Sequence, residues 1–119
     1  WYGNREGNNL VAMVKSLNQR TGKPIVFSEL SYRSVDGNNI NPGAWQAKPT
    51  DVIDPQEQAD CYEAFMRVWS GEKAPWMLGV LWWQWLVEPA PDRYVSHDQT
   101  PQNLVAQSTI TRWFTGLAP

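Results

Sequence analysis

The sequence predicts an α/β fold in which helices alternate with strands of a parallel sheet. Two short, nearly uncharged apolar runs, at residues 23–29 and 77–85, are typical of strands buried on both faces. Segments with apolar residues at helical spacing precede, separate and follow these runs, as in βα units. Two strands can neither close a barrel nor protect their own edges. We therefore predict one partial domain over residues 1–119, with no second domain.

The first two helices have clear start and stop signals. Asn8 or Asn9 is the expected N-cap of the first helix, and Gly22 ends it. Asp54, followed by proline at the first helical position, is the expected N-cap of the second helix, which ends at Gly71. The predicted buried face of this helix comprises Ala59, Tyr62, Phe65, Met66 and Trp69, with Cys61 as a small core residue.

The third helix is predicted to open at Thr100-Pro101, because proline is favoured in the first helical turn. Its expected inner face holds Ala106, Ile110, Trp113, Phe114 and Leu117.

Composition excludes several classes of function. The net charge is -2 and no basic run occurs, so neither nucleic acid nor a membrane surface is an expected partner. The chain contains no signal peptide and no apolar run long enough to cross a membrane, and it leaves the compartment open. Because Cys61 and His97 are the only residues of their kinds, we expect no metal and no cofactor.

Glu29 is the candidate catalytic residue. It closes the first apolar run, and the carboxyl ends of parallel strands are where α/β folds keep their active sites. The alternative is a polar residue that simply leaves the core where the strand ends.

Tryptophan is the most unusual feature of the composition, with eight in 119 residues. Trp83 and Trp85 are candidates for stacking on a sugar ring, since an indole offers a large flat face and one N–H donor. Strand alternation predicts that both point the same way and that Trp82 points the opposite way. Alternatively, these tryptophans are core residues.

Two long irregular connections follow the predicted strands, at residues 30–53 and 86–99. Connections of this length inside a domain are often lids or binding loops. The first begins directly after Glu29. Its Tyr32 and Trp45 are candidate substrate-binding residues and make it unlike a purely solvated linker, although disorder is the alternative.

Several of these segments resemble the end of a known barrel. KPIVFSE at 23–29, followed by YRS at 32–34, and GVLWWQW at 79–85 are similar to strands seven and eight of clan A glycoside hydrolases. The combination of KPIVFSE with YRS and the Trp-rich second run favours family 113, whose known members are β-mannanases, and the similarity extends to TPQ at 100–102 and WF at 113–114. The resemblance spans nearly the whole chain but only about the last third of a (β/α)₈ barrel.

The resemblance implies retaining chemistry, with Glu29 as the nucleophile that attacks the anomeric carbon. Trp83 or Trp85 would lie beneath the sugar, and Tyr2 would hydrogen-bond the nucleophile. Family members commonly have glycine where Ser31 stands here, which leaves the local turn open.

A retaining enzyme also needs an acid/base carboxylate about 5–5.5 Å from the nucleophile. In this clan that glutamate follows strand four, which the resemblance places before residue 1. Within this chain, Glu88 is a possible substitute for that glutamate by residue type.

Three functions remain open. The leading one is a fragment of a retaining glycosidase acting on a mannan-like polysaccharide or oligosaccharide and inactive alone, for lack of the second carboxylate. The second is a noncatalytic carbohydrate-binding module that uses the tryptophans. The third is a chain that self-associates to cover its strand edges.

Overall fold

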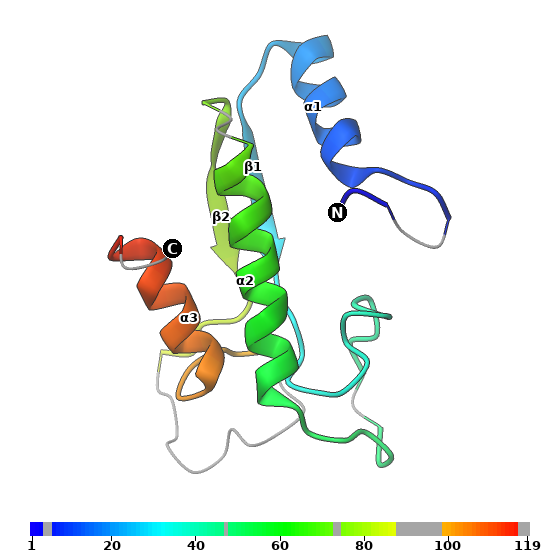
Figure 1. Ribbon diagram of the computed structural model, residues 1–119, viewed down its shortest axis with the longest axis vertical. Coiled ribbons are helices and arrows are strands. Elements are labelled where there is room, and N and C mark those ends of the chain that lie inside the picture. Colours follow the sequence, from blue (N-terminus) through cyan, green and yellow to red (C-terminus); the bar gives the residue numbers. More distant parts are fainter. Residues whose placement is uncertain (4–5, 47, 73–74, 88–98, 117–119) are drawn as a thin grey trace.

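The computed structural model describes the chain except for residues 4–5, 47, 73–74, 88–98 and 117–119. The elements, in order, are α1 (Leu10–Thr21), β1 (Ile25–Leu30), α2 (Pro55–Gly71), β2 (Met77–Trp82) and α3 (Val105–Phe114) (Figure 1). The predicted alternation of helices and strands is therefore confirmed. No helix within the described ranges is both long and apolar enough to cross a membrane.

The helix starts follow the predicted capping chemistry in two cases out of three. The Asn9 side chain accepts a hydrogen bond from the Ala12 N–H (2.9 Å), and Gly22 ends α1 at φ 63°, a conformation that favours glycine. Asp54 accepts from the Glu57 N–H (2.9 Å) at the start of α2. The third prediction is wrong, because α3 begins only at Val105 and residues 101–104 form a turn.

The two strands pair in parallel, with Phe27 opposite Val80 and Leu30 opposite Trp82. The predicted second strand is too long, since β2 ends at Trp82 rather than at residue 85. Burial of the strands on both faces is also wrong for the described chain. Helix α2 lies against one face (Figure 1), but Val26 on β1 and Leu78 on β2 are exposed because nothing in the described ranges covers them.

The core lies between α2 and the sheet. Phe65 on α2 makes edge-on contacts with the rings of Phe27 and Trp82, at centroid distances of 5.7 and 5.8 Å. Predicted core residue Cys61 is buried, and burial raises the pKa of its thiol to about 11. Helix α3 adds the buried Ala106 and Ile110 beside α2.

The predicted inner face of α3 is only partly correct. Phe114, the last residue of α3, is largely exposed, although its ring contacts Trp82 edge-on at a centroid distance of 6.5 Å. Leu117 lies outside the described residues.

Glu63 joins α2 to α3. Its carboxylate accepts a hydrogen bond from the Trp113 indole N–H (2.7 Å) and pairs with Arg67 (2.7 Å) one turn along α2. The indole hydrogen bond, followed by the arginine, lowers the pKa of Glu63. This glutamate therefore has a structural role.

Candidate active site

Glu29 lies at the carboxyl end of the sheet. It is the penultimate residue of β1, its side chain is exposed, and it has no hydrogen-bond or ion-pair partner among the described residues. The next residue, Leu30, accepts a hydrogen bond at its carbonyl from the Trp83 N–H (2.9 Å). The predicted nucleophile and the tryptophan segment are thus brought to the same end of two paired strands.

Trp83 and Trp85 are 48% and 49% exposed, whereas Trp82 packs edge-on against Tyr62 and Phe65 of α2. The expected alternation fails beyond Trp82, because the strand ends there. Trp85 lines an apolar hollow of about 380 Å³ together with Trp82 and residues of α3. Trp82 and Trp85 therefore line the same hollow, and Trp83 follows directly after the end of β2.

Tyr32 belongs to the buried core, whereas a residue that contacts a sugar would be exposed. Its ring packs edge-on against Tyr62 at 5.1 Å, and it is buried. Burial raises the pKa of its phenol well above the ordinary value, so the hydroxyl stays protonated at neutral pH. A role in substrate binding stays a prediction for this residue.

The connection after β1 is an ordered loop organised around a buried arginine. The alternative of disorder is therefore wrong for the described part of this loop. Arg33 is 3% exposed, and its guanidinium pairs with Asp51 (2.5 Å) and donates to the Ala44 carbonyl (3.2 Å). These contacts hold distant parts of the loop around a hollow of about 170 Å³. Trp45, next to the held carbonyl, is 71% exposed and free to meet a ligand.

Tyr2 has a different partner from the expected one. Its hydroxyl donates to Glu72 (2.7 Å), which follows the C-terminal end of α2 and also pairs with Lys15. The reason is the packing of Trp1, whose ring rests against Trp69 in the last turn of α2 and so carries Tyr2 away from the carboxyl end of β1. The expected hydrogen bond to Glu29 is therefore not formed in this structure.

A chain of buried polar side chains connects the segments that follow the two strands, and the sequence reasoning did not identify it. The Gln58 amide donates to the carbonyls of Tyr32 (2.7 Å) and Thr100 (3.3 Å). The Thr100 hydroxyl donates to Gln102 Oε1 (3.0 Å), and the Gln102 amide exchanges two hydrogen bonds with the Leu86 backbone. The available signal was Gln58, which stands one residue before the apolar Ala59 at the start of the predicted buried face.

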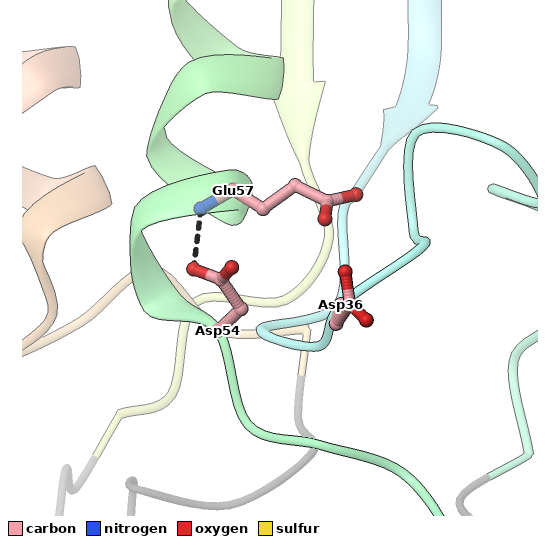
Figure 2. A group of neighbouring side chains, drawn as sticks. All are labelled: Asp36, Asp54 and Glu57. Atoms are coloured by element: carbon pink, nitrogen blue, oxygen red, sulfur yellow. Dashed lines mark hydrogen bonds between the residues drawn. The ribbon is translucent and has the colours of Figure 1, made fainter.

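Asp36, Asp54 and Glu57 form an acidic group at the start of α2, with carboxylate oxygens within 4.8 Å of one another (Figure 2). Asp54 is the helix N-cap, and the Glu57 carboxylate accepts hydrogen bonds from the backbone N–H groups of Gly37 (2.9 Å) and Asn39 (2.8 Å). The two glutamate contacts attach the loop to α2. Two of the three carboxylates, those of Asp54 and Glu57, therefore already accept hydrogen bonds from backbone N–H groups.

Neither hollow is lined by Glu29. The considered substitute for the acid/base residue, Glu88, lies outside the described residues.

Comparisons with known proteins address the fold and the family. The sequence model of Glycoside Hydrolase Family 113 matches residues 1–103. Two solved structures, described as a GH113 beta-1,4-mannanase and a complex of a GH113 beta-1,4-mannanase, superpose with TM-scores of 0.73 and 0.75 at 20% identity. Each match covers 88% of this chain but only 33% of the mannanase chain. A search of curated proteins found no match.

Proposed function

Because this chain belongs to glycoside hydrolase family 113, we propose that it supplies the nucleophile and part of the sugar platform of a retaining β-mannan hydrolase. Its fold is that of one part of a (β/α)₈ barrel, and it spans a third of the length of the mannanases that it matches. The observation that carries the proposal is the position of Glu29, exposed at the carboxyl end of β1, next to the backbone pair between Leu30 and Trp83.

Glu29 would act as the nucleophile of a double displacement. Its carboxylate would attack the anomeric carbon, and the glycosidic C–O bond would break as a glycosyl ester forms. A residue at a strand end is suited to this role, because paired backbone holds the carboxylate in place. In the described chain, Glu29 has no cationic or hydrogen-bonding partner that would have to be displaced.

The reaction also needs an acid/base group, which protonates the leaving oxygen in the first step and activates water in the second. We propose that the acid/base belongs to the rest of the barrel and that the chain of 119 residues alone does not turn over. The substrate class that we propose is β-1,4-linked mannan, following the activity named for the two matched structures.

The nucleophile can be tested without an acid/base group. Fluoride leaves without protonation, so 2-deoxy-2-fluoro-β-mannosyl fluoride can transfer its sugar to a carboxylate with loss of fluoride alone. We expect mass spectrometry of the treated chain to find one fluoromannosyl ester, on the peptide that contains Glu29, and none in the Glu29→Gln variant.

Glu57→Gln is the matched control, because it removes an acidic side chain from the same half of the molecule without touching β1. Labelling spread over several carboxylates, or undiminished in Glu29→Gln, would contradict the nucleophile role. Hydrolysis of mannotetraose by the chain alone, abolished in Glu29→Gln, would contradict the proposed inactivity while supporting the nucleophile.

A noncatalytic carbohydrate-binding function is the second candidate, favoured by the exposure of Trp83, Trp85 and Trp45. Tryptophan fluorescence titrated with mannotetraose separates the two functions. For the catalytic role we expect binding to weaken in both Glu29→Ala and Trp83→Ala. Binding that survives Glu29→Ala unchanged but is lost in Trp83→Ala would support the noncatalytic module instead.

Exposed apolar residues on the two strands form a surface that a partner could cover. Val26 and Leu78 present apolar surface that the rest of a barrel, or a second copy of this chain, would cover. Self-association stays a prediction.

A further inference from the structure

We propose that Gln102 is a positioning residue, which holds the Trp83–Trp85 segment in place through the backbone of Leu86; the sugar-binding consequence rests on the proposed function. The segment follows the end of β2, and its first residue, Trp83, still donates a backbone hydrogen bond to β1. Contacts from outside the sheet hold its other end.

Both ends of the segment have backbone partners. At the first end, the Trp83 N–H donates to the Leu30 carbonyl (2.9 Å). At the other end, Gln102 Oε1 accepts from the Leu86 N–H (2.5 Å), and Gln102 Nε2 donates to the Leu86 carbonyl (2.9 Å). A primary amide that exchanges two hydrogen bonds with one residue replaces the strand that is missing there. The first and third residues of this stretch, Trp83 and Trp85, carry the two half-exposed indoles.

The Leu86 N–H, which can only donate, fixes the orientation of the Gln102 amide, and Thr100 supports it. The Thr100 hydroxyl donates to the same Gln102 Oε1 (3.0 Å). Thr100 in turn accepts at its carbonyl from Gln58, which also holds the carbonyl of Tyr32 three residues after Glu29. The network thus connects the segment after the nucleophile to the segment that carries the indoles.

Burial makes this connection costly to lose. Gln102 is 5% exposed, and Gln58 and Thr100 are fully buried. Removal of the Gln102 amide would leave the Leu86 N–H and carbonyl without these partners, and a buried polar group without a partner is unfavourable. We expect the segment to move until water or another group satisfies them.

The test compares Gln102→Met, which keeps the length of the side chain but removes both hydrogen bonds, with Gln107→Met. Gln107 also bonds to backbone, accepting from the Asn103 N–H (2.7 Å), but it makes no contact with Leu86. Nuclear magnetic resonance follows the exchange of the Leu86 amide and the indole N–H signals of Trp83 and Trp85, assigned with tryptophan-to-phenylalanine variants. Fluorescence titration gives the Kd for mannotetraose.

In Gln102→Met we expect faster exchange at Leu86, shifted indole signals for Trp83 and Trp85, and a Kd raised about tenfold, as expected for two lost hydrogen bonds. In Gln107→Met these quantities should equal those of the parent chain. Adding Trp83→Ala should remove most of the effect of Gln102→Met on Kd, since the glutamine acts through the indoles.

Unchanged indole signals in a folded Gln102→Met variant, or an unchanged Kd, would overturn the positioning role. If Gln102→Met does not fold, Gln102→Glu keeps the oxygen that accepts from Leu86 and loses only the donor, and the same readouts decide. If the parent chain binds no mannotetraose but its indole signals respond to Gln102→Met, the proposed function fails and the positioning role stands.

Discussion

Replacement of Arg33 by methionine is expected to lower the free energy of unfolding by about 3–5 kcal/mol, the usual cost of breaking a buried ion pair from one side. The Arg33 side chain is 4% exposed and that of Asp51 is 15% exposed, so the substitution leaves a nearly buried carboxylate without its cation. It also removes the donor to the Ala44 carbonyl. Urea denaturation, followed by tryptophan fluorescence, measures the loss.

Arg67→Met is the matched control. Arg67 also pairs with a glutamate, but its side chain is 59% exposed, and exposed pairs contribute only about 0–1 kcal/mol. Combining Arg33→Met with Asp51→Asn should recover part of the lost stability, because the uncompensated charge is then absent. Equal losses for the two arginine variants would show that Arg33 does not organise the loop.

Replacement of Phe65 by alanine is expected to cost about 3–5 kcal/mol, because the cavity lies where α2 meets the sheet. The ring is 4% exposed and contacts Trp1, Phe27 and Trp82 at centroid distances of 5.5–5.8 Å. Phe65→Leu should cost less, since most of the volume remains. The free energy of unfolding in urea measures both effects.

Phe114→Ala is the control, because it removes the same phenyl ring from an exposed position without creating a buried cavity. Phe114 touches Trp82 at 6.5 Å but is largely exposed, so its loss should cost less than about 1 kcal/mol. If Phe65→Ala lowered the free energy of unfolding as little as Phe114→Ala, this would contradict a core centred between α2 and the sheet.

Local signals accounted for most of the secondary structure. The N-caps at Asn9 and Asp54 and the glycine at position 22 act through neighbours within a few residues, so the sequence pattern alone identifies them. The errors lie where distant residues compete with local preference. Thr100 and Gln102 bond to one another, Gln102 also bonds to Leu86, and α3 starts only after them, although proline favours an earlier start.

In the candidate site, too, local sequence predicted some features and missed those that depend on distant residues or on where a strand ends. The strand-end position of Glu29 follows from an apolar run that closes on a carboxylate, and β1 contains it as predicted. The shared hollow of Trp82 and Trp85 could not be read from alternation, because alternation holds only while a strand continues and β2 stops at Trp82. Tyr2 was placed wrongly for a related reason, since Trp1 packs on Trp69, almost seventy residues away.

The sequence by itself determined the order of helices and strands, the family and the carboxylate at the end of β1. These depend on periodicity, capping and motifs, all of which are local in the chain. Only the tertiary structure decided that Arg33 organises the loop after β1 and that Gln58, Thr100 and Gln102 connect this loop to the tryptophan segment. Such contacts join residues far apart in sequence, where each buried polar group takes the partner that folding brings within reach.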